Sequence, residues 1–168
     1  MPIDAYLLYV NDVGSFEELY HREYPNLVAV ARALTGDRGD AEDLVQDTMV
    51  KAFVHWTRLS RYGKPGAWCH RVLTRACRDH WQRRRTRTRY LMAHRVAEPT
   101  VDGPALEFVA FWAAVRRLPE RPRLVVTLYY AGDRSVAEVA SIVGAPEGTV
   151  KSDLARARIA LRTDLGED

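Results

Sequence analysis

Residues 135–162, SVAEVASIVGAPEGTVKSDLARARIALR, predict two short helices joined by a turn. Ser135 and Glu138 have the spacing of a capping box, which marks a helix start. Gly144 favours the end of that helix, and Pro146 favours the first turn of the next one. The positions expected to face inward are apolar: Val136, Val139, Ala140, Val143, Val150, Leu154, Ala157 and Leu161. The pattern is typical of a helix-turn-helix.

The outer face of the second helix suits a DNA groove, because it combines small side chains, hydrogen-bonding ends and flanking cations. An ordinary helical hairpin is the alternative interpretation. The cap, the glycine turn, the proline and the polar outer face together favour DNA binding. The expected contacts are Glu147, Gly148, Thr149, Lys151, Ser152 and Arg156.

Residues 105–130 extend this helical unit toward the N-terminus. LPERPR (118–123) predicts a break between two helices. LVVTLYY (124–130) has the β-branched content of a strand, but its position among helices favours a short buried helix. The helix before the break has a predicted core face of Leu106, Phe108, Val109, Phe111, Trp112, Val115 and Leu118.

A segment without clean periodicity, TRTRYLMAHRVAEPTVDGP (86–104), ends in Asp-Gly-Pro and predicts a flexible interdomain linker. We therefore expect an all-α protein of two small helical domains. The predicted domains are 1–85 and 105–168, joined by the linker 86–104.

The first domain contains a strongly basic stretch, WCHRVLTRACRDHWQRRRTRTR (68–89), in which Asp79 is the only acid. Stepping by about 100° per residue places one cationic stripe along a helix. An apolar face lies opposite, so we predict an amphipathic helix that starts near Pro65, after a loop over 60–66. A solvated charged face is the alternative, but such faces usually mix signs. The stripe comprises Arg71, Arg75, Arg78, Gln82, Arg85 and Arg89, and the apolar face comprises Cys69, Val72, Leu73, Ala76, Cys77 and His80.

The two cysteines do not predict a metal site or a disulfide. Cys69 and His80 lie roughly 16 Å apart along such a helix. Cys77 and His80 could share one ion but lack two further ligands. Cys69 and Cys77 are about 12 Å apart, too far for a disulfide. Both are expected to be small core residues in a protein from a reducing compartment.

Residues 37–47, DRGDAEDLVQD, form an acidic helix start. Asp40 is the predicted N-cap, after a turn over 35–40, with Asp43 as a weak capping-box partner. An earlier helix is expected over 16–34, divided or kinked at Pro25. The expected buried side of the acidic helix is Leu44, Val45, Thr48, Met49, Ala52, Phe53 and Trp56.

The whole chain has 168 residues, 47% of them hydrophobic, and a net charge of +3. Separate acidic and basic segments indicate two different partners, one of them anionic. The first residues lack the pattern of a signal peptide, and no apolar run is long enough to span a membrane, so we expect a cytoplasmic protein without a membrane partner. No carboxylate cluster, nucleophile–base pair or phosphate loop predicts an enzyme or a cofactor. His21 and His94 are expected to be surface residues.

Three segments resemble the extracytoplasmic-function (ECF) sigma factors of bacterial RNA polymerase. DAEDLVQDTMVKAF (40–53) is similar to their core-binding helix in region two. AWCHRVLTRACRDHWQRRR (67–85) is similar to the helix that reads the minus-ten element, and residues 118–162 are similar to region four, which reads the minus-thirty-five element. All three motifs in this order and spacing are highly specific. The short linker also fits this small class.

The resemblance implies that the chain binds core RNA polymerase and recognises and melts promoter DNA. It implies contacts with the clamp helices of the largest subunit and the flap of the second-largest subunit. The loop 60–65 would capture a flipped base, and Trp56 and Trp68 are expected to be core residues. The implied clamp-binding residues are Asp40, Glu42, Asp43, Gln46 and Asp47, and the implied minus-ten residues are Tyr62, Lys64, Arg71, Arg75, Arg78, Arg83 and Arg85.

One residue departs from the family pattern. Relatives often carry asparagine at the position of Arg75, and asparagine reads adenine whereas arginine prefers guanine or phosphate. An anti-sigma protein is a further candidate partner. The alternative function, a stand-alone helix-turn-helix regulator, would account for residues 105–162 but not for the acidic helix or the arginine stripe.

Overall fold

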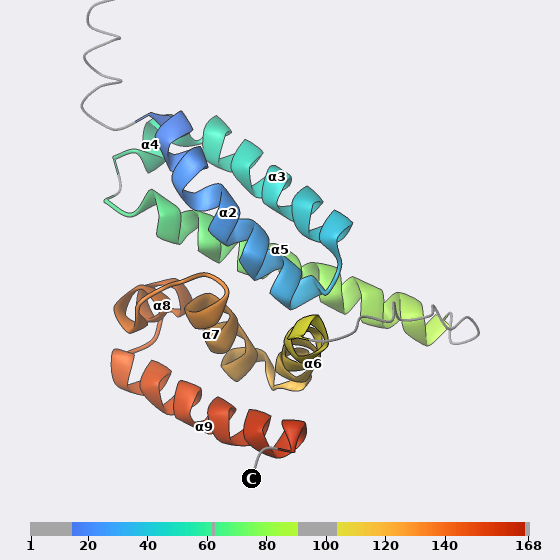
Figure 1. Ribbon diagram of the computed structural model, residues 1–168. Coiled ribbons are helices and arrows are strands. Elements are labelled where there is room, and N and C mark those ends of the chain that lie inside the picture. Colours follow the sequence, from blue (N-terminus) through green and yellow to red (C-terminus); the bar gives the residue numbers. More distant parts are fainter. Residues whose placement is uncertain (1–14, 62, 91–103, 167–168) are drawn as a thin grey trace, which may run out of the picture.

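The computed structural model describes residues 15–61, 63–90 and 104–166, and the side chains of 85–90 and 104–107 lie outside the description. The described chain contains helices and no strand, which confirms the predicted fold class (Figure 1). The helices are α2 (Phe16–Thr35), α3 (Arg38–Val54), α4 (Trp56–Leu59), α5 (Pro65–Tyr90), α6 (Pro104–Arg117), α7 (Glu120–Tyr130), α8 (Val136–Val143) and α9 (Glu147–Leu165).

Helices α2 to α5 form a first helical unit, in which α2, α3 and α5 pack against one another. A capping box between Ser15 and Glu18 starts α2, and the left-handed Gly36 ends it. Pro25 does not divide the helix, because α2 continues through it. Pro25 cannot donate to the carbonyl of His21, but both residues are exposed, so water can bond that carbonyl.

Helix α3 begins earlier than predicted. Its N-cap is Asp37, whose carboxylate accepts a hydrogen bond from the Asp40 amide at 2.8 Å. The cap predicted at Asp40 is therefore wrong, and Asp40 lies in the first turn. The prediction of a buried Phe53 is also wrong, because its side chain is 64% exposed. Phe53 lies beside Phe16, where α2 begins, so little of that neighbouring helix remains to cover it.

The basic helix α5 begins at Pro65, as predicted, and buries Cys69, Leu73 and Cys77. It continues to Tyr90, so residues 86–90 are helical and the predicted linker boundary at 85 is too early. The rest of the predicted linker, 91–103, and His94 with it, lies outside the described residues.

Helices α6 to α9 form a second helical unit, with a short buried α7 as predicted. The capping box of Ser135 and Glu138 and the left-handed Gly144 confirm the predicted start and end of α8. Pro146 is the N-cap of α9 rather than a first-turn residue. The four predicted inward residues of α9, Val150, Leu154, Ala157 and Leu161, are all buried. Phe108 and Val109 of α6, predicted to be core residues, are exposed.

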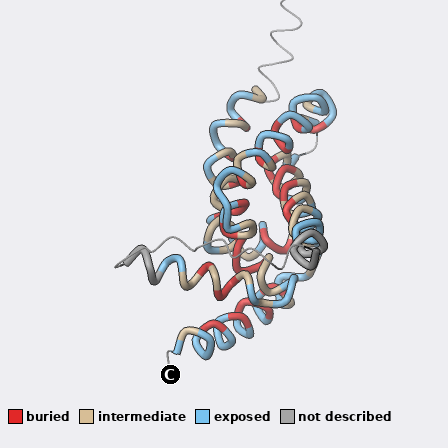
Figure 2. The backbone as a smooth tube through the Cα atoms, turned by 90° about the vertical axis from the view of Figure 1, so that its right-hand side faces the viewer, coloured by how far each residue is buried: buried red, intermediate tan, exposed pale blue. Residues whose placement is uncertain are grey.

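The two helical units pack directly on each other. Helix α8 lies against α5, and α6 and α7 lie against α2. Figure 2 shows buried segments in both units, on the sides where their helices face one another. The position of Gly132, in the turn after α7, shows how close the units come: a Cβ there would lie 3.0 Å from a methyl group of Val30 in α2 and 2.7 Å from the Leu128 carbonyl oxygen. A larger residue would therefore separate this turn from α2.

Candidate nucleic-acid interface

The cationic stripe predicted for α5 is present on the surface. Arg71, Arg75, Arg78 and Arg83 are exposed, while Cys69, Leu73 and Cys77 on the opposite face are buried. The helix is therefore amphipathic, with an apolar side fixed to the core and a cationic side at the surface. The side chains of Arg85 and Arg89 lie outside the described residues.

Two arginines of the stripe already bind the second helical unit. The Arg71 guanidinium donates to the Ser141 carbonyl oxygen in α8, with Nε at 3.2 Å. Arg78 pairs with Glu120 at the start of α7 at 3.2 Å. Arg75 has no hydrogen bond or ion pair to another described residue, so it is available to an external partner.

Arg75 also lines a shallow hollow of about 370 Å³ beside α3. Lys51, Trp68 and Arg71 contribute to the same hollow, together with one acid, Asp79. Three cations next to a half-buried tryptophan suit a phosphate with an adjacent aromatic base. Trp68 and Trp56 are half-buried and pack against the core.

The loop before α5 is only partly described. Lys64 is exposed, whereas Tyr62 lies outside the described residues. The predicted base-capturing role of this loop therefore stays a prediction.

The outer face of α9 is open to solvent, as the helix-turn-helix interpretation requires. Glu147, Gly148, Lys151 and Ser152 are exposed, and Thr149 is half-buried. Ser152 donates to the Gly148 carbonyl oxygen at 3.0 Å. These side chains surround the N-terminal end of α9, the part of such a helix that enters a groove.

Arg156, further along α9, is exposed but not free. It pairs with Asp153 at 2.6 Å, and Asp153 also binds Arg121 of α7 at 2.8 Å. Asp153 is buried, so these two arginines neutralise a carboxylate that fastens α9 to α7.

The acidic helix α3 divides into two parts. Asp40 turns toward α5, where its carboxylate lies 3.1 Å from the His80 ring nitrogen and 3.0 Å from Arg84. Glu42 pairs with Arg38 at 2.7 Å. The other predicted clamp-binding residues, Asp43, Gln46 and Asp47, are exposed and have no such bond to another described residue.

An exposed apolar strip continues this acidic face toward the end of α3. Val50, Phe53 and Val54 are 61%, 64% and 69% exposed. Exposed apolar side chains grouped on one helix are typical of a protein-binding surface. The sequence analysis missed this strip because it assigned Phe53 to the core.

A buried ion cluster, Glu23, His70 and Arg134, joins the two helical units and was also missed. Glu23 of α2 pairs with Arg134, which precedes α8, at 2.6 Å, and its carboxylate lies 3.5 Å from the His70 ring nitrogen. The three side chains are 4%, 14% and 0% exposed for Glu23, Arg134 and His70. Glu23 lies four residues from both Leu19 and Leu27 of the α2 core, and this spacing was the available signal.

The Glu23 carboxylate is ionised despite its burial. Burial opposes ionisation, but the nearby side chains of His70, Arg22 and Arg134 outweigh it and lower the pKa to about 2. Gly66, in the first turn of α5, leaves space for this carboxylate, because a Cβ there would lie 2.5 Å from Glu23 Oε1.

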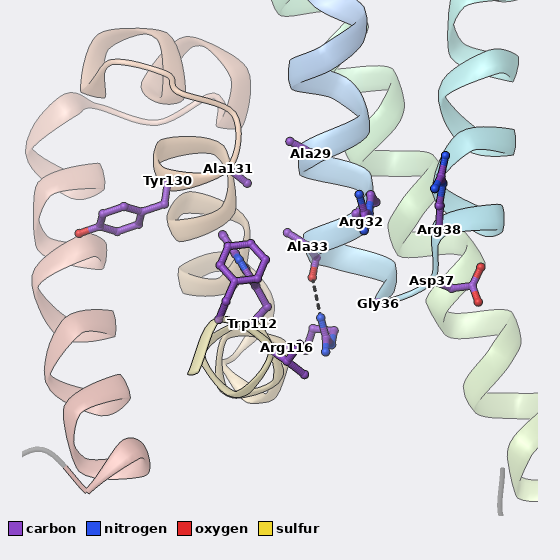
Figure 3. A pocket seen from close by; sticks show the side chains of 12 residues that line it. Ala29, Arg32, Ala33, Gly36, Asp37, Arg38, Trp112, Arg116, Tyr130 and Ala131 are labelled. Atoms are coloured by element: carbon purple, nitrogen blue, oxygen red, sulfur yellow. Dashed lines mark hydrogen bonds between the residues drawn. The ribbon is translucent and has the colours of Figure 1, made fainter. Parts of the chain in front are cut away.

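A groove of about 460 Å³ runs between α2, α6 and α7 (Figure 3). Ala29, Ala33 and Trp112 form part of its apolar wall, and Phe108 and Val109 also line it. Charged side chains from α2, α3 and α6 stand at its edge: Arg32, Asp37, Arg38 and Arg116. The Arg116 guanidinium donates to the Ala33 carbonyl oxygen at 3.3 Å, across the boundary between the two units.

Neither cysteine is placed for chemistry. Burial raises the pKa of Cys69 and of Cys77 to about 12, so both remain protonated thiols. Within the described ranges, no cluster of three or more His, Cys, Asp or Glu side chains could hold a metal ion.

Among the helices described, none has the length and hydrophobicity to span a membrane. His21 is exposed, as predicted.

Two family models match the chain. Sigma-70 region 2 matches residues 19–87 and sigma-70 region 4 matches residues 108–161. The ECF RNA polymerase sigma factor SigM of Mycobacterium tuberculosis (strain ATCC 25618 / H37Rv) is 31% identical, with 97% of this chain and 85% of the relative covered. The ECF RNA polymerase sigma factor EcfG of Rhodopseudomonas palustris (strain TIE-1) is also 31% identical, with 86% and 81% covered.

Two solved structures are similar in fold. The sigma factor RpoE, in complex with the anti-sigma factor NepR from Bartonella quintana, gives a TM-score of 0.69 at 28% identity, covering 91% of this chain and 98% of that one. CnrH, in complex with the cytosolic domain of CnrY, gives a TM-score of 0.65 at 23% identity, covering 91% and 88%. The second likeness concerns the fold alone.

Proposed function

Because the chain belongs to the ECF sigma factors, which direct transcription initiation, we propose that it recruits core RNA polymerase to promoters with two separate DNA-binding faces. The first helical unit would bind and melt the minus-ten element through α5. The second would bind the minus-thirty-five element through α9. The chain would act in the cytoplasm, where its DNA and polymerase are.

The observation that carries this proposal is the presence of two solvent-facing DNA-type surfaces on two different helical units. The cationic stripe of α5 suits phosphates, and the small polar face of α9 suits base edges in the major groove. One helix-turn-helix alone would leave the stripe without a role. Two surfaces on one chain match two promoter elements.

For the polymerase contact, we propose the exposed part of α3. Asp43, Gln46 and Asp47 would bind the basic clamp helices, and the apolar strip of Val50, Phe53 and Val54 would pack beside them. Asp40 and Glu42 would support the helix instead, since both already hold internal cations. The flap of the second-largest subunit would contact the second helical unit.

For the minus-ten element, we propose Arg71, Arg75, Arg78, Arg83 and Arg85 as phosphate or base contacts, with Tyr62 and Lys64 at a flipped base. For the minus-thirty-five element, we propose Glu147, Gly148, Thr149, Lys151, Ser152 and Arg156. Phosphate contacts would hold the position of the protein on the duplex, and base contacts would supply sequence preference.

Run-off transcription with core polymerase and a randomised promoter library tests this function. The chain should enrich templates that share two spaced elements, whereas core polymerase alone should enrich none. Substitution of Lys151 and Ser152 by alanine should relax only the upstream element. If the chain bound duplex DNA but never stimulated core polymerase, it would be a stand-alone regulator and the proposal would be wrong.

We also propose an anti-sigma protein as a partner, bound at the groove between α2, α6 and α7. The similar solved structure of the sigma factor RpoE is a complex with the anti-sigma factor NepR. Exposed Phe108 and Val109 would receive an apolar helix, and the arginines at the edge favour acidic flanks. A protein captured by the wild type but not by Phe108→Asp, and able as a purified protein to inhibit run-off transcription, would be this partner. A captured protein that bound Phe108→Asp equally well would exclude the groove.

A further inference from the structure

The two proposed DNA-binding faces differ in their accessibility to an external partner. The outer face of α9 is open, whereas the stripe of α5 is partly occupied by the second helical unit. Arg71 donates to Ser141, and Arg78 pairs with Glu120. A guanidinium whose donors are used in this way cannot also bind a DNA phosphate with the same groups.

Further contacts hold the second unit in this position. The Arg123 guanidinium of α7 lies 4.8 Å from the centre of the Trp81 ring in α5, and burial lowers the pKa of Arg123. Arg116 binds the Ala33 carbonyl oxygen. These contacts are spread over α2 and α5, so the second unit is held at several separate points.

The buried ion cluster is the most demanding of these contacts. Glu23 belongs to the first unit and Arg134 to the second, and both are nearly inaccessible to water. A buried carboxylate needs a partner, since desolvation penalises its charge. Moving the second unit away would remove Arg134 and let water reach Glu23. The packing of the second unit on the first and this ion pair therefore stabilise each other.

We propose that the closed arrangement is autoinhibitory, and that the Glu23–Arg134 pair holds the second helical unit over the α5 stripe until a partner or DNA opens it. The proposal rests on the proposed function in one respect only, the assignment of α5 to DNA. Opening would release Arg71 and Arg78 together. While it is closed, the free chain would bind DNA only weakly through α5, although the α9 face stays exposed.

Distances between two spin labels would test closure directly. The labels would sit on Thr57→Cys in α4 and Arg162→Cys in α9, both exposed positions, while the native cysteines are buried and poorly reactive. The wild type should give a narrow main distance peak with only a minor component at longer distance. Arg134→Ala should give a broader and longer one, and Glu23→Gln, which keeps the side-chain shape, should do the same.

The matched control is Arg121→Ala. Arg121 also pairs with a carboxylate that is 4% exposed, Asp153, but both residues belong to the second unit. This variant loses the same charge without touching the boundary between units. Its distance distribution should stay that of the wild type. Circular dichroism would confirm that all variants keep their helices.

DNA binding gives the second measurement, using a short random-sequence duplex and no polymerase. The Arg134→Ala and Glu23→Gln variants should bind about tenfold more tightly than Arg121→Ala, the gain expected if the open state is about one tenth of the free chain. Their salt dependence should also be steeper, because more arginines reach phosphates. Unchanged label distances, or open variants that bind no more tightly, would overturn the proposal. A failure of run-off transcription would reject the proposed function without changing either result.

Discussion

At the scale of single residues, the buried Glu23 carboxylate explains why its neighbour in space is a glycine. Its oxygen atoms are held by Arg134 and Arg22 at 2.6 and 3.0 Å. They lie so close to α5 that a Cβ on Gly66 would overlap one of them. Glycine normally weakens a helix, so its presence in the first turn of α5 reflects the space that this carboxylate occupies.

Gly66→Ala should therefore destabilise the protein, although alanine is the better helix former. Displacing the restrained Glu23 carboxylate should cost about 1–3 kcal/mol, more than the gain in helix propensity of about 1 kcal/mol. Gly148→Ala in α9 is the control, because no atom lies within 4 Å of the added Cβ and the substitution should be neutral or stabilising. Urea unfolding of both variants measures the difference. Equal stability of Gly66→Ala and the wild type would show that Glu23 can move freely.

Arg75 is the residue at which the resemblance predicts a departure from the family pattern. It is exposed and unpaired among the described residues, and it lines the hollow beside Trp68. If Arg75 reads a base edge, Arg75→Asn should change the preferred base at one minus-ten position by about 1–3 kcal/mol. If it binds only phosphate, the same substitution should weaken all promoters equally. A randomised minus-ten library transcribed by wild type and variant separates the two, and enrichment profiles of identical shape would refute base reading.

At the scale of elements, α3 carries two functions on two sides. Ala41, Val45 and Ala52 bury one side against α2 and α5. The other side presents Asp43 and Asp47, which have no hydrogen bond or ion pair to another described residue. Because these acids contribute nothing to the core, charge reversal there can change binding without unfolding the protein.

Asp43→Arg combined with Asp47→Arg should weaken binding to core polymerase by more than about tenfold, or about 1.4 kcal/mol. Repulsion from basic clamp helices is the expected cause, and the thermal unfolding temperature should change little. Glu17→Arg, at an 81% exposed acid of α2, is the control for charge reversal elsewhere. Co-elution of each variant with core polymerase on a sizing column is the measurement. A double variant that still co-elutes fully would exclude α3 as the docking helix.

At the scale of the whole molecule, the ionisation of Glu23 makes the packing of the two units depend on pH. The pKa of Glu23 is about 2 in the folded protein and 4.5 ordinarily, so folding favours its ionised form. A lowered pKa contributes stability that is complete above about pH 4.5 and is lost as pH falls toward 2. Glu138, whose pKa is lowered by hydrogen bonds from Ser135 and by Arg134, acts in the same direction.

Acidification from pH 5 to pH 2 should therefore lower the free energy of unfolding, with Glu23 accounting for a loss on the order of 3 kcal/mol. Part of this loss weakens the contact between the two units, so the spin-label distance distribution should broaden over the same pH range. Glu23→Gln has no ionisable group at this position and should lose less stability between these pH values. Identical pH profiles for Glu23→Gln and the wild type would show that Glu23 does not contribute.

Local patterns in the sequence determined most of the elements and the fold class. The capping box of Ser135 and Glu138, the turn at Gly144 and the spacing of Val150, Leu154 and Ala157 all act over a few residues, and the structure confirms them. The amphipathic phase of α5 is equally local. Such signals depend only on neighbours along the chain, so sequence reasoning can read them.

The tertiary structure decided which side chains are free. Whether Phe53 and Phe108 are covered depends on where neighbouring helices end. Whether Arg71 and Arg78 are free depends on the second helical unit, which is distant from α5 in the sequence. Glu23 and Arg134 are more than a hundred residues apart, yet each makes the burial of the other tolerable. No local pattern encodes such a pairing, because its energy arises only when folding removes both charges from water.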